Sequence, residues 1–270
     1  MNRCELIAEI GWNHMGDMKL AEKMISEASN SGVEYCKFQT WKVKNLKDGP
    51  WNKDGRLEIY NKAELSDKDH YELVNLCKKY NVKFLTSVFN ISDLKFVSEL
   101  SNHSIKIPSH EVYNLKLIKQ SCEIFKKVFI SISACKWNEF KNILKLDIDL
   151  KKVYFMHCVS SYPLSEENVN FPKLLEIQKS HKQIGYSGHL KGIEDAIAAI
   201  NFGALIVEKH FTIDNELPGR DNKFALLPNE MKSISRYRDI FSKMNINKGL
   251  DIQECEMDIY NNYRGRWSKN

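Results

Sequence analysis

The sequence predicts a (β/α)8 TIM barrel, a single-domain α/β fold, from three observations. Eight short apolar runs recur along the chain, and segments with helical spacing of apolar residues lie between them. Strict alternation of strands and helices indicates a parallel sheet, and eight units indicate that this sheet closes on itself. The length of 270 residues also suits one such barrel, which typically takes roughly 250 residues.

The eight predicted strands share one feature, because nearly every apolar run ends in polar residues. The runs cover 6–9, 36–39, 84–87, 105–109, 128–131, 154–157, 184–189 and 205–210. In a barrel of parallel strands, the C-terminal strand ends and the loops after them form the face that carries the active site. Carboxylate, ammonium, hydroxyl and imidazole groups therefore gather at one place, and the pattern predicts an enzyme.

The helices are predicted from capping residues and apolar spacing. In the first of them, Asp17 can cap the start, apolar residues recur at helical spacing, and Gly32 follows the end. The polar run 66–69 begins another helix, which extends to Tyr80. The remaining helices are expected at 91–100, 114–125, 137–146, 170–180, 192–202 and 228–243.

The segment from Trp41 to Leu65 is predicted to be a long loop, because Gly-Pro at 49–50 and Asp-Gly at 54–55 interrupt it. A loop of this length in a compact fold commonly covers a site. We therefore expect it to act as a lid over the polar face or as part of a subunit interface.

The barrel is expected to occupy residues 1–245, followed by a C-terminal tail over 246–270. This tail is polar with scattered aromatic residues, and its structure does not follow from the pattern. Trp267 in the tail joins Trp41 and Trp51 as a candidate interface or lid residue.

Composition excludes several classes of protein. The net charge of +5 is mild and spread along the chain, so we expect no nucleic-acid binding. The seven cysteines form no CxxC pair, their number is odd, and two lie in predicted core strands, which is typical of a reducing compartment. No apolar run approaches the ~18 residues of a membrane span, and no signal peptide is expected before Leu6. We expect a cytoplasmic protein without a membrane partner.

Two histidines give the most specific pattern. His189 and His210 stand at the ends of the last two strands, which are neighbours in a closed barrel. Two imidazoles there can share a divalent metal ion, with substrate and water completing its shell. The alternative is a pair of hydrogen-bonded surface histidines, and we favour the metal because both have polar neighbours. His14, His110 and His157 are weaker candidates, and His157 is expected to be a core residue.

Lys37 and Lys106 each lie inside an apolar strand, where a lysine is costly unless it is paired. Two ammonium groups near serine hydroxyls suit a phosphate or carboxylate ligand. A structural ion pair with Glu9 or Glu208 is the alternative, and both can hold. A Schiff-base lysine, as in class I aldolases, is a competing function. The serines expected beside the lysines are Ser109, Ser131 and Ser187.

Three further side chains follow strands. Glu9 can act as a base, a metal neighbour or a hydroxyl acceptor, or can simply support its loop. Tyr162 can stack on or bond a sugar, or cover the core. Asp221 is a candidate for substrate hydroxyls, although its turn needs no function. Nucleotide-binding GxGxxG and P-loop motifs, HExxH and a nucleophile elbow are missing from the sequence.

These residues resemble the catalytic barrel of the sialic acid synthase family, the phosphoenolpyruvate-dependent enzymes that make nonulosonic acids. The similarity runs in the family's order from residue 6 to about residue 240. The matching stretches are AEIGWNHMG at 8–16, KFQT at 37–40, KIPS at 106–109, MHCVSSYP at 156–163, GYSGH at 185–189, EKHFT at 208–212 and PGRD at 218–221.

The resemblance implies roles for single residues. His189 and His210 match the metal ligands, with Mn²⁺ first and Mg²⁺ or Co²⁺ as alternatives, and Glu208 lies beside the metal. The positions that match the phosphoenolpyruvate pocket are Lys37, Lys106, Ser87, Ser109, Ser131, Ser160 and Ser187. The positions that face the acceptor sugar are Glu9, Gln39, Tyr162 and Asp221.

The implied reaction is a transfer that forms a carbon–carbon bond. Carbon 3 of phosphoenolpyruvate attacks the aldehyde of an open-chain aldose or N-acyl amino-aldose, with the metal as Lewis acid. Phosphate leaves, and a 3-deoxy-2-keto sugar acid forms. Glu9 is the first candidate for moving protons. A synthase for phosphorylated sugars and a catalytically silent sugar-binding barrel remain alternatives. The resemblance also implies a homodimer and a role in cell-surface carbohydrate biosynthesis.

The sequence departs from the family at three places. Family members usually continue into an antifreeze-like domain that lends an arginine to the partner's acceptor site. This sequence stops near that linker, so we expect N-acetyl recognition from that domain to be absent, with Arg264 or Arg266 as candidate substitutes, and the choice between N-acetylmannosamine and another acceptor stays open. Gly188 stands where an aspartate is common, and Met15 where an asparagine is common. Both changes are expected at the mouth of the site.

Overall fold

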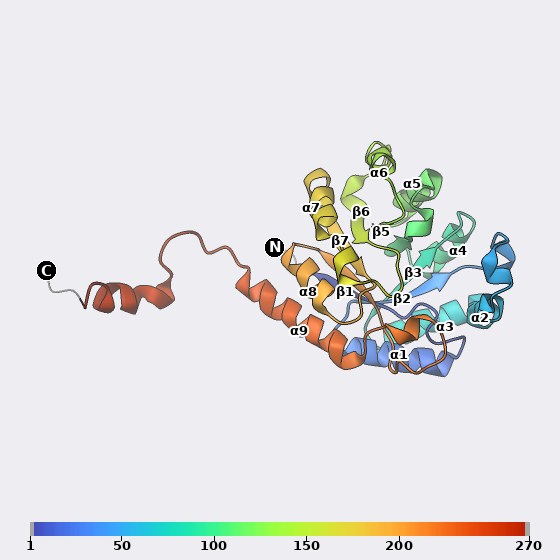
Figure 1. Cartoon of the computed structure of the whole chain (residues 1–270), viewed down its shortest axis with the longest axis horizontal. Coiled ribbons are helices and arrows are strands. Elements are labelled where there is room, and N and C mark those ends of the chain that lie inside the picture. The colour runs from blue at the N-terminus through green and yellow to red at the C-terminus, as the bar shows by residue number, and fades with distance from the viewer. Residues whose placement is uncertain (1–2, 268–270) are drawn as a thin grey trace.

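The computed structural model describes residues 3–267, and its eight parallel strands form one closed barrel (Figure 1). Each strand pairs with the next along the chain, and β8 pairs with β1, where Glu9 stands opposite His210. The predicted TIM barrel is confirmed. The strands are β1 Glu5–Glu9, β2 Tyr35–Thr40, β3 Lys83–Val88, β4 Ser104–Ile107, β5 Lys127–Ile132, β6 Val153–Cys158, β7 Ile184–Gly188 and β8 Ile206–His210.

Helices surround the barrel and begin close to where the sequence predicts. The Asp17 carboxylate accepts from the first backbone amides of α1, and Ser66 and Asp69 form a reciprocal cap on α3. The main helices are α1 Met18–Asn30, α3 Asp67–Lys79, α4 Asp93–Leu100, α5 Leu115–Ile124, α6 Trp137–Leu144, α7 Phe171–Ser180, α8 Glu194–Asn201 and α9 Pro228–Met244. Each of the predicted helices is confirmed to within a few residues.

The segment 41–65 is more ordered than the expected loop. It contains helix α2, Arg56–Ala63, and two short 3₁₀ turns. Only Ala63 of α2 is buried, so the sequence shows little of the apolar periodicity that marks a helix. Tyr60 fixes the helix instead, because its ring stacks on Trp12 with the centroids 5.2 Å apart. The expectation of an irregular segment was therefore wrong.

The barrel interior has an apolar floor and a polar layer above it. The floor consists of Ile7, Tyr35, Leu85, Phe129, Met156 and Ile206. Side chains two positions apart on a strand point to the same side, so the next inward residue on each of these strands lies one layer higher. Those next residues are Glu9, Lys37, Ser87, Ser131, Cys158 and Glu208. The period of two thus explains why polar residues end apolar runs.

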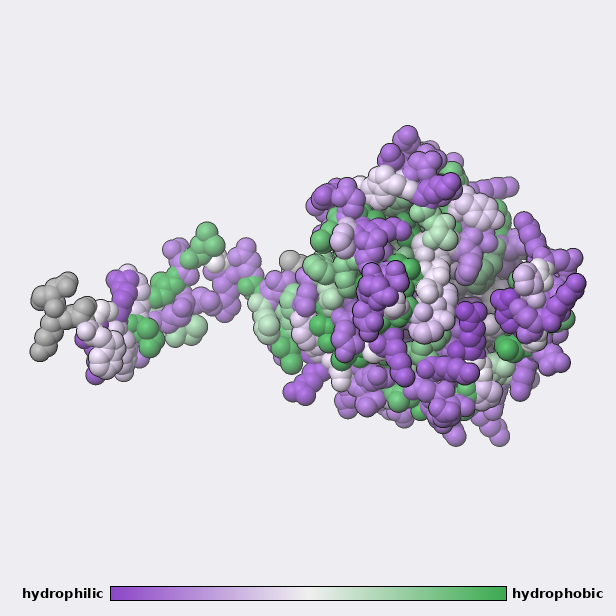
Figure 2. Space-filling model, in the orientation of Figure 1, coloured by the Kyte–Doolittle hydropathy of each residue, from purple (hydrophilic) through white to green (hydrophobic). Residues whose placement is uncertain are grey.

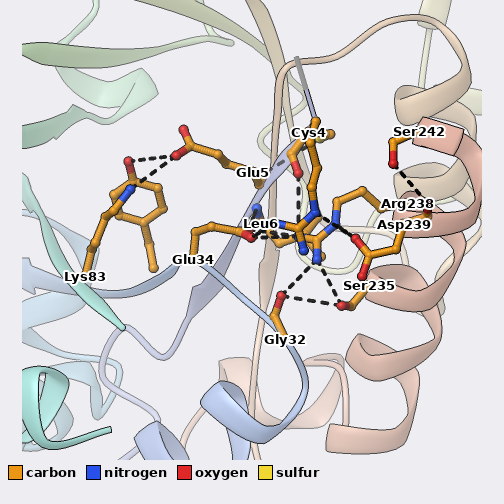
Figure 3. Close-up of polar contacts among 12 residues, drawn as sticks. Cys4, Glu5, Leu6, Gly32, Glu34, Lys83, Ser235, Arg238, Asp239 and Ser242 are labelled. Atoms are coloured by element: carbon orange, nitrogen blue, oxygen red, sulfur yellow. Dashed lines mark hydrogen bonds and ion pairs between the residues drawn. The ribbon is translucent and has the colours of Figure 1, made fainter. Parts of the chain in front are cut away.

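An ion network joins both ends of the barrel sequence on the side where the strands begin (Figure 3). Arg238 of α9 is 1% exposed and lies 2.8 Å from Glu34 Oε2. It also donates to the Gly32 carbonyl at 3.2 Å. Glu34 in turn accepts from Arg3 and from the backbone amide of Leu6 in β1. This network fastens α9 to the start of the sheet.

The residues after α9 extend away from the barrel (Figure 1). They contain a 3₁₀ turn at Glu254–Glu256 and a π-helical turn at Ile259–Tyr263, and hydrophobic residues alternate with hydrophilic ones along them (Figure 2). Arg264 packs on the Tyr260 ring, 3.8 Å from its centroid, instead of reaching the barrel. Within the described residues, no helix has the length and apolar character needed to cross a membrane.

Candidate active site

A cavity of about 740 Å³ opens at the C-terminal ends of the strands. The polar layer forms its base, and the loops after the strands form its walls. The predicted site residues that line it are Glu9, Lys37, Gln39, Ser87, Lys106, Ser109, Ser131, Tyr162, Ser187, His189, Glu208, His210 and Asp221. Ser160 stands just behind them, with its hydroxyl 2.9 Å from that of Ser109. The structure therefore brings all the predicted residues together.

Two lysines and two glutamates form a buried charge cluster at the base of the cavity. Lys37 Nζ lies 2.8 Å from Glu9 Oε2 and 3.7 Å from Glu208 Oε1. Lys106 Nζ lies 2.7 Å from Glu208 Oε2. The four side chains are at most 7% exposed. The ion-pair alternative of the sequence analysis therefore holds, because each lysine has a glutamate partner.

Two serine hydroxyls complete this cluster. Lys37 Nζ donates to Ser87 Oγ at 3.0 Å, and Ser187 Oγ donates to Glu208 Oε1 at 3.1 Å. Strand β3, which pairs with β2, supplies Ser87, and strand β7, which pairs with β8, supplies Ser187. Buried charges are stable only when their remaining hydrogen-bonding capacity is satisfied, and the serines do this without adding charge.

The two glutamates have opposite acid–base properties. Burial raises the pKa of Glu9 to about 7, against the attraction of the Lys37 ammonium. Burial acts to raise the pKa of Glu208 as well, but Lys106 and Lys37 outweigh it and hold that pKa at about 2. Glu208 is thus a fixed negative charge near neutral pH, while Glu9 can gain or lose a proton there.

The two lysines also differ. Burial lowers the pKa of Lys106, and Lys37 adds to this effect, although Glu208 opposes it. Burial acts in the same sense on Lys37, but the carboxylates of Glu208 and Glu9 outweigh it and raise the pKa. Lys37 is therefore the more firmly held cation of the two.

The residues that the resemblance assigns to the acceptor all line the cavity. Gln39 Nε2 donates to Glu9 Oε1 at 2.8 Å, which orients the carboxyl group. Asp221 accepts from the indole nitrogen of Trp12 at 2.8 Å. Tyr162 packs on the His189 ring, with centroids 4.2 Å apart. Carboxyl, amide and phenol groups thus share one cavity, a set that can bind several sugar hydroxyls.

His189 and His210 fit a divalent metal. Their ring centroids are 5.5 Å apart, and burial lowers each pKa to about 3, so both imidazoles are neutral, as metal ligation requires. His189 Nδ1 donates to the Val159 carbonyl at 2.8 Å, which leaves its Nε2 lone pair available. His210 Nδ1 is buried without a hydrogen-bond partner, 3.7 Å from Asp221 Oδ2.

No set of three His, Cys, Asp or Glu residues close enough to hold a metal ion occurs in the part of the chain that the structure describes. The two histidines would therefore hold the ion with substrate or water oxygens as its other ligands. Such an open shell is typical of catalytic rather than structural metal sites.

Sequence reasoning gave no catalytic or binding role to the aromatic wall of the cavity. Trp12, Trp41 and Tyr60 line it, and the Trp41 ring stands edge-on to the other two at 6.3 and 5.7 Å. Arg56 and Arg220 also line the mouth, and Arg220 lies 5.7 Å from the centre of the Tyr162 ring. These residues lie on loops or on α2, where no strand period predicts the direction of a side chain. The aromatic residues within the segment 41–65 were the signal in the sequence that could have indicated this aromatic wall.

The other candidate residues are divided between the core and the cavity wall. His157 is fully buried, and its Nε2 donates to the Val169 carbonyl at 2.7 Å, so its predicted place in the core is confirmed. His14 is also fully buried, whereas His110 lines the cavity. Gly188 does not line the cavity, so its expected place at the mouth was wrong, whereas Met15 is partly buried beside Gly219, in the loop that carries Asp221. Gly188 faces the α8 side of β7, where it touches Asp195.

The chain is similar to known proteins along most of its length. A family model described as the NeuB family matches residues 24–247. The N,N'-diacetyllegionaminic acid synthase of Campylobacter jejuni is 34% identical over 87% of this chain and 75% of its own length. The enzyme of the same name from Legionella pneumophila is 31% identical over 86% of this chain and 70% of its own. The crystal structure of N-acetylneuraminic acid synthetase from Leptospira borgpetersenii superposes with a TM-score of 0.86 at 28% identity, covering 97% of this chain and 93% of the other.

Proposed function

The chain belongs to the NeuB family, and on that premise we propose that it condenses phosphoenolpyruvate with an open-chain aldose or N-acyl amino-aldose. The protein is an enzyme that forms a carbon–carbon bond, as are the synthases it resembles. The products would be a 3-deoxy-2-keto sugar acid and inorganic phosphate. The observation that carries the proposal is the pair of buried ammonium groups of Lys37 and Lys106 beside two neutral imidazoles.

Phosphoenolpyruvate carries a carboxylate and a phosphate, so its pocket needs concentrated positive charge. Lys37 and Lys106 supply that charge, and both side chains are buried. Electrostatic interactions at a buried site are stronger than in water. Hydroxyl groups around them can donate to the remaining oxygens. We assign this role to Ser87, Ser109, Ser131 and Ser187, with Ser160 supporting Ser109.

We infer that His189 and His210 hold a divalent metal ion, Mn²⁺ first and Mg²⁺ or Co²⁺ as alternatives. When bound, the ion would supply Lewis acidity toward the aldehyde carbonyl of the acceptor. The bond from His189 Nδ1 to Val159 holds that ring in one orientation, and Tyr162 packs against its face. The protein thus fixes the His189 imidazole in advance of binding.

The reaction needs several proton transfers, and Glu9 is the proposed acid–base group. Carbon 3 of phosphoenolpyruvate bonds to the aldehyde carbon, and the aldehyde oxygen takes up a proton. Water adds to carbon 2 and loses a proton, after which the bond from carbon 2 to the phosphate oxygen breaks. A carboxyl group with a pKa of about 7 suits such proton movements near neutral pH, and Gln39 orients it. Asp221 and Tyr162 face the acceptor hydroxyls in this arrangement.

The test is phosphate release from phosphoenolpyruvate with free aldoses, N-acyl amino-aldoses and sugar phosphates, in Mn²⁺ and in EDTA. Release that needs both the metal and one aldehyde class is the expected result, and the class identifies the acceptor. A His189→Ala/His210→Ala variant serves as the matched control, because it keeps the lysine cluster. Release that persists in EDTA would contradict the metal assignment. Trapping of pyruvate by borohydride on Lys37 or Lys106 would instead support an aldolase.

A further inference from the structure

A second buried ion pair lies behind the two histidines, on the outside of the barrel. Lys209 stands between Glu208 and His210 on β8, so its side chain points away from the cavity toward α8. Lys209 Nζ lies 2.8 Å from Asp195 Oδ1 and 2.9 Å from Oδ2, and the two side chains are at most 3% exposed. The same ammonium group donates to the Leu190 carbonyl at 2.6 Å. Leu190 directly follows His189.

The Asp195 carboxylate is fully satisfied. Besides Lys209, it accepts from the Tyr186 hydroxyl at 3.0 Å and from the backbone amide of Ala196 at 2.8 Å. A buried carboxylate with this many donors is stable, whereas the loss of either charge would leave the other unpaired in a low-dielectric site. Lys209 and Asp195 therefore connect β7, β8 and α8 through one rigid contact.

Gly188 provides the space for this carboxylate. A Cβ atom at position 188 would lie 2.4 Å from Asp195 Oδ2 and 2.6 Å from the Tyr186 ring, closer than real Cβ contacts allow. It would also lie 3.0 Å from Cδ of Lys209. An aspartate at position 188 would thus bring its carboxylate into the space that the Asp195 carboxylate occupies, next to the same lysine. Only one of the two positions can carry the charge.

We propose that Asp195 is a positioning residue for the proposed synthase reaction and that Gly188 and Asp195 act as a pair, because the absence of a side chain at position 188 leaves the space in which the Asp195 carboxylate reaches Lys209. Through Lys209, this carboxylate fixes the residue after His189 and the residue before His210 relative to each other. The proposal rests on the proposed function for its effect on catalysis, while the pairing itself concerns the fold.

Four variants separate the pair from its parts. Asp195→Asn removes the charge but keeps the size of the side chain. Asp195→Ala and Gly188→Ala/Asp195→Ala leave Lys209 unpaired, and the latter adds the Cβ at 188. Gly188→Asp/Asp195→Ala has the same Cβ and restores a carboxylate. Glu176→Ala on the exposed face of α7 is the control for a surface carboxylate.

The first readout is the unfolding midpoint in EDTA, which does not depend on activity. We expect it to fall in Asp195→Asn and further in Gly188→Ala/Asp195→Ala, and to recover in Gly188→Asp/Asp195→Ala. The second readout is the Mn²⁺ affinity from calorimetry, together with kcat and KM measured separately. Loss of a positioning residue is expected to weaken metal affinity or kcat by about 10- to 100-fold.

Recovery of both readouts by the restored carboxylate supports the proposal. Equal midpoints for the two double variants would overturn the pairing, even if the enzyme were inactive with every acceptor. Recovery of the midpoint without recovery of Mn²⁺ affinity or kcat, in an enzyme shown to be active, would overturn the positioning role and leave a purely structural pair.

Discussion

Among the residues that the structure describes, Lys106 has one carboxylate partner, Glu208 at 2.7 Å, whereas Lys37 has Glu9 as well. Lys106 is therefore the ammonium group more available to an incoming anion. Its lowered pKa has the same origin, because burial opposes the charge and one carboxylate compensates for it only in part. The two lysines thus carry the same ammonium group but differ in the carboxylates that pair with it.

We predict that Lys106→Met lowers kcat/KM for phosphoenolpyruvate by about 10- to 100-fold, the worth of a charge-assisted hydrogen bond. Steady-state kinetics with saturating acceptor measures this. Lys179→Met, which removes a lysine that is 74% exposed, is the matched control and should leave kcat/KM unchanged. Equal values of kcat/KM in the two variants would show that Lys106 does not bind phosphoenolpyruvate.

Part of the predicted site followed from one physical rule, whereas Gln39, Ser87 and Ser160 came from the family resemblance. Side chains on a strand alternate in direction, so a polar residue two positions beyond an apolar floor residue must enter the cavity. Lys37 above Tyr35 and Glu208 above Ile206 are examples. Arg220 could not be predicted in this way, because its direction depends on its contact with Tyr162 rather than on a period.

Helix α2 shows the corresponding limit at the scale of elements. Strands and amphipathic helices could be predicted because burial imposes a period on their sequences. Helix α2 buries only Ala63, and its place depends on rings that lie far apart in sequence, Trp12 and Tyr60. The cavity wall on this side is therefore a tertiary feature that no local pattern encodes.

We predict that Tyr60→Ala raises KM for the acceptor by about 10-fold, since an aromatic contact contributes about 1 kcal/mol beyond its buried area. KM for phosphoenolpyruvate should change little, because the lysine cluster lies at the base of the cavity. Initial rates with each substrate varied in turn measure both constants. Tyr71→Ala, at a tyrosine that is 49% exposed on α3, is the control. A rise in both constants together would argue against a wall that acts on the acceptor alone.

Helix α9 depends on Glu34, which directly precedes β2. We predict that Glu34→Ala lowers the free energy of unfolding by about 3 kcal/mol, because the buried Arg238 guanidinium loses its more buried carboxylate partner and keeps Asp239, which is 45% exposed. Urea unfolding measures this loss. Glu22→Ala, which breaks the exposed pair with Lys79, should have little effect. A similar small effect for both variants would show that the network in Figure 3 does not stabilise the barrel.

At the scale of the whole molecule, we expect acid to lower the free energy of unfolding through buried histidines. Burial lowers the pKa of both His14 and His157 from 6.5 to about 4. A lowered histidine pKa means that the folded state prefers the neutral ring, so this contribution is present above pH 6.5 and is lost as the pH falls toward 4. We predict that His157→Gln, which keeps a donor for the Val169 carbonyl, flattens this loss by up to about 3 kcal/mol.

Urea unfolding at pH 7 and at pH 4.5 provides the comparison. The difference between the two pH values should be smaller in His157→Gln than in the unmodified protein. The reference is His181→Gln, since His181 lies on the outside of the barrel and is only partly buried. Equal pH dependence in all three proteins would refute the role of His157.

The homodimer stays a prediction of the sequence. Light scattering over a range of concentrations should give twice the 31.5 kDa of one chain. A mass of one chain at every concentration would exclude it. The predicted division into a barrel at 1–245 and a tail beyond it also stays a prediction, although the residues after α9 lie apart from the barrel in Figure 1.

The closure of β1 against β8 has a consequence for biosynthesis. The ribosome makes β1 first, but the second neighbour of β1 appears only when residues 206–210 have been translated, and Arg238 later still. Until then, the nascent chain presents an unpaired strand edge, the type of surface that joins other chains. Slow or interrupted translation between β7 and α9 should therefore convert more of the product to aggregate than a pause after Met244.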